Sequence, residues 1–345
     1  MASDLEKKAA LDDTLIPTSS PKLELKSSSV QVGHGTITDE LVLSKDGFAL
    51  FPQPVLNDSL DPLNWSWMQK HAILSIIMAL YFMFTYITTT TVPSFPALQE
   101  QYSATLEQIN WTVAIPALGL SVGPLLWASP ADIIGRRPIL ILGTIMALAS
   151  TVGAALAPSY PGYMAARFFQ GLGVSPASNV GLAVINDIFF EHERGQKLGL
   201  WVLAIDMGLL FGPLIGGFVS LAGQAWAQWL SAILLGVILI SEVFFLPETL
   251  YPRKTMLVES KEGRGLDLAP TRTKKLGWTQ VKPLPGMKHP RVYDTVVRFA
   301  KTWKYAMVPV AVMTYCFGWY WWVLSVVTLV PVAYAETYPE AHVQG

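Results

Sequence analysis

Long apolar runs alternate with polar connections along most of the chain. A bilayer core about 30 Å thick requires about 20 apolar residues in one helix to cross it, and seven runs reach that length. The predicted membrane-spanning helices cover residues 71–92, 110–131, 138–158, 163–186, 198–221, 226–247 and 305–331. The pattern therefore predicts an all-α membrane protein.

The polar segments divide the chain into four parts. Residues 1–70 are rich in Ser, Pro, Asp and Lys and poor in apolar groups, which predicts a disordered tail. Residues 71–247 hold six helices joined by short connections, and residues 248–304 form a basic linker. Residues 305–345 contain the seventh helix. We expect a six-helix bundle followed by the start of a second unit.

The positive charges test this division independently, because Lys and Arg accumulate on the cytoplasmic side of membrane proteins. Of the 24 basic residues, all but Arg167 lie in the tail, the linker, or the connections after the second and fourth helices. A chain that crosses the membrane alternately places all of these segments on one side. The amino terminus and the linker are predicted to be cytoplasmic.

Composition narrows the class of protein further. Charged residues make up 14% of the chain, against about 25% in soluble domains. Cys316 is the one cysteine and the five histidines are scattered, so no disulfide, zinc site or redox pair is expected. No phosphate-binding loop of the GxxxxGK[ST] type is present. We expect no enzyme, no metal, no cofactor and no nucleic-acid partner.

The run 198–221 contains small residues at every fourth position: Ala204, Gly208, Gly212, Gly216 and Ser220. Such residues form one smooth helix face that lets a second membrane helix approach closely. Pro213 removes a backbone donor and is expected to bend the helix. The face serves either ordinary helix packing or a specific step of function.

Several motifs resemble those of the major facilitator superfamily. "GLLFGPLIGG", with Gly208, Gly212, Pro213, Gly216 and Gly217, resembles the antiporter motif G-x-x-x-G-P-x-x-G-G of its drug:proton antiporters. "ASPADIIGRRPIL" resembles its loop signature G-x-L-x-D-R-x-G-R-R, and "ARFFQGLG" its R-x-x-Q-G motif. "DPLNWSWMQK", "ERGQKLGLW" and "PETL" resemble the fungal multidrug-exporter branch.

This resemblance implies the superfamily's N-terminal six-helix bundle plus the seventh helix of an incomplete second bundle, in a chain truncated after that helix. In the family the antiporter motif packs against the eighth helix, so the glycine face is expected to meet the second half. The loop signature is a conformational latch in the family, which implies that role for Asp132, Gly135, Arg136 and Arg137. The alternative is a basic anchor alone, and Ala128, Pro130 and Ile133 depart from the signature.

Three ionisable residues lie inside predicted helices. Arg167 is costly there unless it faces protein or water, and Gln170 follows on its side of the helix in a polar stripe expected to face an aqueous cavity. The resemblance implies proton coupling for Arg167, and the alternative is a side chain that reaches the interface. Asp206 lies away from the glycine face and is expected to face the cavity as a proton carrier or as the partner of a cation. Glu242 is expected to be a water-exposed structural acid.

Aromatic residues gather in the seventh helix as "FGWYWW". Some of these rings must face lipid, and Trp319 and Trp322, with Asn179, are candidates to line a substrate cavity. Thr88–Thr91 are expected to bond their own backbone.

The sequence thus predicts a transporter that exports small apolar or cationic compounds by alternating access, driven by the proton gradient. Its partners would be the small-molecule substrate, protons and the lipid bilayer, and it would be monomeric when full length. The resemblance favours the plasma membrane. The alternatives are a truncated protein that does not transport and interferes with or derives from such a carrier, and a carrier for solute uptake.

Overall fold

Helices form almost all of the structure that a computed structural model of the chain describes. It describes residues 24–25, 42–43, 50–55, 58, 60–223, 225–253, 293–318 and 321. The helices of the first half are η1 (Pro62–Asn64), α2 (Trp67–Thr89), η2 (Val92–Ser94), α3 (Phe95–Tyr102), α4 (Leu106–Ile133) and α5 (Arg136–Ala155). Those that follow are α6 (Tyr160–Val174), α7 (Pro176–Ile188), α8 (Glu191–Ser220), α9 (Ala225–Phe245), α11 (Asp294–Thr302) and α12 (Met307–Gly318). The short strands β1 (Glu24–Leu25) and β2 (Val42–Leu43) pair antiparallel, with Glu24 opposite Leu43.

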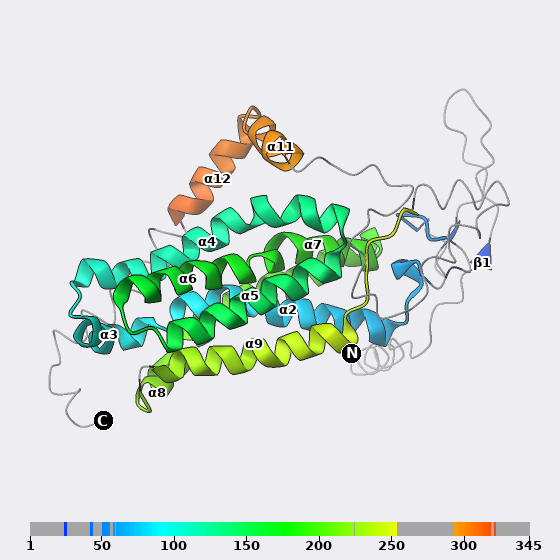
Figure 1. The fold of residues 1–345 in the computed structure, drawn as a ribbon. Coiled ribbons are helices and arrows are strands. Elements are labelled where there is room, and N and C mark those ends of the chain that lie inside the picture. Colours follow the sequence, from blue (N-terminus) through cyan, green and yellow to red (C-terminus); the bar gives the residue numbers. More distant parts are fainter. Residues whose placement is uncertain are drawn as a thin grey trace, which may run out of the picture.

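Six helical spans between Trp67 and Phe245 are long and apolar enough to cross a membrane. They lie roughly parallel in one bundle, with the Gly135 turn at one end and the loop after Ala155 at the other (Figure 1). We call these the Gly135 end and the Arg167 end, because Arg167 lies towards the latter. The predicted six-helix bundle is confirmed.

The bundle core comes from helices that are distant in sequence. α2 packs along α8, α5 lies between α6 and α9, and α4 packs on α6. The main apolar cluster includes Ile77 and Met83 of α2, Leu140 of α5, Ile185 of α7 and Leu235 of α9, all fully or almost fully buried. Apolar side chains such as Leu210, Phe218 and Phe244 remain exposed on the outside, as expected for a surface that lipid covers.

The predicted fourth helix, residues 163–186, is divided in two. α6 ends at Val174, and α7 begins at Pro176 as its first residue. Proline has no backbone N–H and favours the first turn of a helix. α8 in contrast continues through Pro213 to Ser220. Pro213, which is predicted to bend this helix, therefore does not interrupt it.

Part of the predicted disordered tail is packed against the Gly135 end. Leu50 and Leu63 form a buried cluster with Phe190. Asp61 is fully buried, accepts hydrogen bonds from the backbone N–H groups of Val55 and Leu63, and pairs with Arg253 at 3.1 Å. For residues 50–55 and 60–66 the prediction of a disordered tail is wrong, because Asp61 supplies the acceptors that order the chain.

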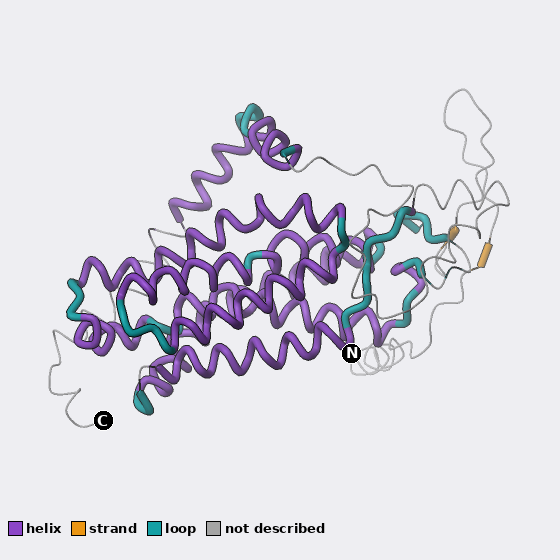
Figure 2. The backbone as a smooth tube through the Cα atoms, viewed as in Figure 1, coloured by secondary structure: helices purple, strands orange, loops and turns teal. Residues whose placement is uncertain are grey.

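The second half of the chain starts earlier than the hydropathy pattern predicts. α11 lies within the predicted linker, residues 248–304, and α12 begins the predicted seventh helix, residues 305–331. Both lie on the side of α4 (Figure 2), where α11 contacts α4, and none of the described residues of α12 is buried. Trp319 and Trp322 lie outside the described residues, so their role in lining a substrate cavity stays a prediction.

Candidate functional site

A buried arginine ties three helices together near one end of the bundle. Arg167 of α6 has no exposed surface. Its Nη1 donates to the carbonyl of Ile87 at 2.7 Å and to Oε1 of Gln170 at 2.6 Å. Nη2 donates to Oγ1 of Thr91 and to the carbonyl of Thr112, both at 3.2 Å, and Nε donates to that carbonyl at 3.3 Å. All five N–H groups of the guanidinium are used, and every acceptor is uncharged.

This arrangement corrects the predicted orientation of the polar stripe. Arg167, Gln170 and Ser175 are each 0% exposed and face the bundle interior, so the predicted aqueous cavity beside them is wrong for these residues. Thr91 also does more than bond its own backbone, because it accepts a hydrogen bond from Arg167. The alternative of an Arg167 side chain that reaches the interface is likewise excluded by its burial.

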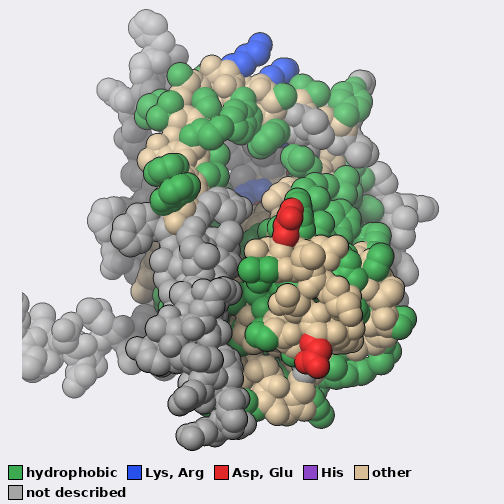
Figure 3. All heavy atoms as spheres, turned by 90° about the vertical axis from the view of Figure 1, so that its left-hand side faces the viewer, with side chains coloured by type: hydrophobic (Ala, Val, Ile, Leu, Met, Phe, Trp, Pro, Cys, Tyr) green, Lys and Arg blue, Asp and Glu red, His purple; other side chains and the backbone are tan. Residues whose placement is uncertain are grey.

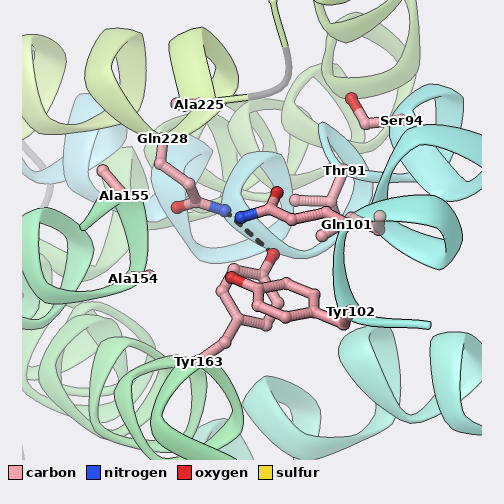
Figure 4. A pocket seen from close by; sticks show the side chains of 10 residues that line it. Thr91, Ser94, Gln101, Tyr102, Ala154, Ala155, Tyr163, Ala225 and Gln228 are labelled. Carbon is pink, nitrogen blue, oxygen red and sulfur yellow. Dashed lines mark hydrogen bonds between the residues drawn. The ribbon is translucent and has the colours of Figure 1, made fainter. Parts of the chain in front are cut away.

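A hydrogen-bond chain continues from Arg167 to a small cavity. Nε2 of Gln170 donates to Thr151 at 2.8 Å and to Oε1 of Gln228 at 3.3 Å, and Nε2 of Gln228 donates to the hydroxyl of Tyr163 at 3.4 Å (Figure 4). The cavity, of about 30 Å³, has room for about two water molecules. It is lined by Thr91, Ser94, Leu98, Gln101, Tyr102, Ala154, Ala155, Tyr163, Ala225 and Gln228.

The Arg167 end of the bundle carries little charge. Residues 93–109, 159–162 and 222–225 contain no Lys or Arg. Viewed onto this end, the described side chains are mostly apolar or uncharged, with few acidic groups (Figure 3). This charge asymmetry is the basis of the predicted orientation, in which this end is extracellular, and the orientation stays a prediction.

The glycine face of α8 packs against α2, and not against a second half. A Cβ atom at Gly208 would overlap the carbonyl of Phe82, one at Gly212 the side chain of Thr89, and one at Gly216 the carbonyl of Thr90. The close-packing role predicted for the face is confirmed, and its predicted partner is wrong. The reason is that α2 offers threonines and bare carbonyls at the same spacing, whereas Gly217 faces open space.

The latch residues form a compact cluster at the Gly135 end. Arg136 pairs with Asp132 of α4 at 2.9 Å and with Asp187 of α7 at 3.2 Å. Arg137 is buried, and its Nη2 donates to the carbonyl of Val243 in α9 at 2.6 Å. The two arginines therefore join α4, α5, α7 and α9, and their role as a conformational latch stays a prediction. No motif in the sequence marked Asp187 as part of this cluster, because it lies at the end of an ordinary amphipathic helix.

Glu248 completes this cluster by capping α5. Its carboxylate accepts from the backbone N–H of Arg136 at 3.0 Å and from that of Arg137 at 3.2 Å. Gly135 has φ of 132°, and a Cβ atom there would collide with the Glu248 carboxylate. An anion at a helix N-terminus satisfies free N–H groups and opposes the helix dipole. Glu248 lies in the "PETL" motif, but the sequence alone predicted no capping role for it.

Asp206 lies on the side of α8 away from the glycine face, within electrostatic range of Tyr81. The rings of Tyr81 in α2 and Trp201 in α8 stack at 3.9 Å with an interplanar angle of 3°. Asp206 itself is partly buried. A carboxylate next to a flat aromatic surface suits a cation with an apolar body. Nothing in the sequence distinguishes Tyr81 and Trp201 from ordinary core residues in an apolar run, so neither was predicted to lie near Asp206.

Asn179 is engaged with the backbone of a neighbouring helix. Its Nδ2 donates to the carbonyl of Pro124 in α4 at 3.1 Å, and its Oδ1 accepts from the N–H of Val180. Its predicted place in a substrate cavity therefore stays a prediction, and its observed contacts join α7 to α4.

Glu242 is not the water-exposed acid that the sequence predicts. It is 0% exposed in the contact between α9 and α5, where Thr144 lies 3.1 Å from its Oε1. The residue is one turn from the end of α9, a place that is normally close to water. The packing of α5 over α9 excludes water from it here.

Comparison with known proteins decides the family. Residues 75–342 match the Major Facilitator Superfamily. The chain belongs to the major facilitator superfamily. The family is one of transporters and not of enzymes, and the six apolar spans make this chain a multi-pass membrane protein.

The curated relatives are fungal transporters. The chain is 34% identical over 203 residues to the MFS-type efflux pump MFS2 of Trichophyton rubrum, covering 58% of this chain and 34% of the relative. It is 31% identical over 185 residues to the MFS antiporter QDR3 of Candida albicans, covering 52% and 26%. It is 26% identical over 252 residues to the dityrosine transporter 1 of Saccharomyces cerevisiae, covering 71% and 43%. The matched region spans less than half the length of each.

Solved structures share the fold. The partially occluded inward-open xylose transporter XylE from E. coli superposes with a TM-score of 0.54 at 18% identity, covering 75% of this chain and 65% of that chain. A complex of the proton:xylose symporter XylE gives a TM-score of 0.50 at 19% identity, covering 58% and 48%. The fold is that of a major facilitator N-terminal bundle.

Proposed function

We propose that this chain is part of a carrier that exports small apolar or cationic compounds in exchange for protons by alternating access. The observation that carries the proposal is Asp206, a partly buried acid of α8 within electrostatic range of Tyr81, whose ring stacks on that of Trp201. The printed names of an efflux pump and an antiporter among the relatives support the direction of transport.

The exchange follows from the chemistry of one carboxyl group. The Asp206 carboxylate can hold a proton or the positive charge of a substrate, but not both, so binding of one displaces the other. The partly exposed ring of Tyr81, stacked on the buried ring of Trp201, provides apolar surface and a negative ring face for the substrate. Carriers of this kind present a site near the membrane midplane to each side in turn.

In this proposal Arg167 and the latch cluster couple the movements of the helices. Arg167 fixes α2 and α4 to α6 through uncharged acceptors, so it transmits a shift of one helix to the others. The ion pairs of Arg136 hold the Gly135 end closed in one state and open in the other. The proton gradient is the energy source, and the proposed location is the plasma membrane with a cytoplasmic amino terminus.

The test is transport by the purified chain in vesicles with an imposed pH gradient and rhodamine 6G, an apolar aromatic cation, as the probe. In inside-out vesicles with an acidic interior, we expect rhodamine 6G to accumulate inside as protons leave. Asp206→Asn should abolish accumulation, and Glu107→Gln, which removes an exposed acid of α4, should leave it unchanged.

Two results would overturn this proposal. Accumulation driven by the opposite gradient would make the chain an uptake carrier. Absence of transport by the wild-type chain, with the fold verified by circular dichroism, would support the alternative of a protein that does not transport alone.

A further inference from the structure

Glu242 is a carboxylic acid in the interior of the bundle with almost no polar surroundings. It is 0% exposed, and its Oε2 has no hydrogen-bond partner within the part of the chain that the structure describes. No basic side chain of the described residues forms an ion pair with it. An isolated carboxylate is very unfavourable in such a place, whereas a neutral carboxyl is not.

The hydrogen bonds of Thr144 indicate which form is present. Oγ1 of Thr144 lies 3.0 Å from the carbonyl oxygen of Leu140 and 3.1 Å from Oε1 of Glu242. A hydroxyl group carries a single hydrogen, and a carbonyl oxygen can only accept. If Thr144 donates to Leu140, its contact with Glu242 is a hydrogen bond only when Glu242 carries the hydrogen. Both contacts are satisfied at once by a protonated carboxyl that donates to Thr144.

We propose that Glu242 and Thr144 form a proton-binding site inside the bundle, and that the positive charge of Arg137 controls release of its proton. This site is separate from the carboxyl of Asp206. Only its coupling to transport rests on the proposed function. On release the O–H bond of Glu242 breaks, the electron pair stays on the carboxylate, and the proton passes to water.

Arg137 is the basic residue whose hydrogen bonds reach the backbone next to Glu242, and its guanidinium also lies within electrostatic range of the Glu248 carboxylate. Its Nη2 donates to the carbonyl of Val243, the residue after Glu242, and its buried Nε has no partner among the described residues. A carboxylate on Glu242 would attract this guanidinium away from Val243. Because Arg137 also belongs to the latch cluster, loss of the proton would weaken the contact between α5 and α9.

Other charged groups on the helices packed against α9 make no ion pair with Glu242. α2 carries Lys70, whose Nζ donates to the carbonyl of Leu63 at 2.9 Å, and His71. α8 carries Asp206, within range of Tyr81 of α2, and Lys197, which contacts His71 at 3.1 Å. On α5, Arg136 pairs with acids of α4 and α7. Arg137 is therefore the charge that the proposal singles out.

The test is infrared spectroscopy of the full chain in lipid, titrated with base, following the C=O stretch of a protonated carboxyl. We expect this band at neutral pH in the wild type and in Asp206→Asn, and its loss in Glu242→Gln. Thr144→Val should shift its frequency, because the hydrogen-bond partner is removed. Equal thermal stability of Glu242→Gln and the wild type would verify that a neutral side chain suits the site.

A matched pair of variants tests the role of Arg137. Arg137→Met should raise the pH at which the band disappears by about one unit or more, because the opposite charge is removed. Arg136→Met, which removes a neighbouring charge paired with other helices, should not. A band that persists in Glu242→Gln, or equal shifts in the two arginine variants, would overturn the proposal. Failure of Asp206→Asn to alter rhodamine 6G transport would affect the proposed function alone, because the infrared band does not depend on transport.

Discussion

Single charged residues inside the bundle differ in how their polar atoms are satisfied. Arg167 uses all of its donors on carbonyls, a hydroxyl and an amide oxygen. Glu242 in contrast uses one oxygen, on Thr144. The first pattern indicates a fixed structural charge, and the second a group whose charge can change.

The geometry of Arg167 predicts that a lysine cannot replace it. Lysine has three donors and Arg167 makes five contacts. Buried acceptors at Ile87 and Thr112 would lose partners, so we expect Arg167→Lys to lower the unfolding free energy by about 1–3 kcal/mol. Thermal unfolding in detergent measures the change. The control is Arg298→Lys on exposed α11, which should leave the melting temperature unchanged; equal melting of both variants would contradict the argument.

The sequence identified Arg167 but not its surroundings. Its charge within an apolar run marks it as unusual, because such a residue is costly in a membrane. Its partners are backbone carbonyls of Ile87 and Thr112, and any residue type supplies a carbonyl. The surroundings of Glu242 were predicted wrongly for a related reason. Its position near the end of a helix suggests contact with water, and only the packing of α5 against α9 excludes that water.

Whole helices were predicted more accurately than their partners. The hydropathy pattern placed the sixth helix at 226–247, against 225–245 for α9. It could not show that the chain breaks and starts a new helix at Pro176. The prolines that lie within continuous helices are Pro116, Pro124, Pro130 and Pro213. Neighbouring helices decide whether the carbonyls freed by a proline find donors.

The contact between α8 and α2 predicts opposite effects at two adjacent glycines. Gly216→Ala would push a methyl group into the carbonyl of Thr90, and Gly217→Ala would place it in open space. We expect the first change to cost about 1–3 kcal/mol of unfolding free energy through overpacking. The second should be neutral or stabilising, since alanine favours a helix over glycine. Melting temperatures in detergent compare them, and similar values for the two variants would argue against a tight contact.

The molecule as a whole has two ends of different charge. The Gly135 end holds the ion pairs of Arg136 and the buried pair of Asp61 with Arg253. The connections at the Arg167 end contain no basic residue. This asymmetry was readable from the sequence, whereas the joining of four helices by Arg136, Arg137 and Glu248 required the fold.

The charge asymmetry predicts which end reacts with reagents outside the cell. In a Cys316→Ser background, Ala222→Cys lies in an exposed loop at the Arg167 end and Gly195→Cys is exposed near the Gly135 end. A maleimide that cannot cross membranes should label Ala222→Cys in intact cells and Gly195→Cys only after permeabilisation. The reverse pattern would invert the proposed orientation.

The cap on α5 also sets an order for synthesis of the protein. The first N–H groups of α5 find their acceptor on Glu248, which lies 112 residues further along the chain from Arg136. When α5 leaves the ribosome, that acceptor has not been made. The N-terminal turn of α5 must therefore rely on water or lipid headgroups during insertion, and it becomes complete only when α9 has entered the membrane and the chain beyond it has folded back. The segment that follows the last helix of the bundle thus completes the first turn of the third.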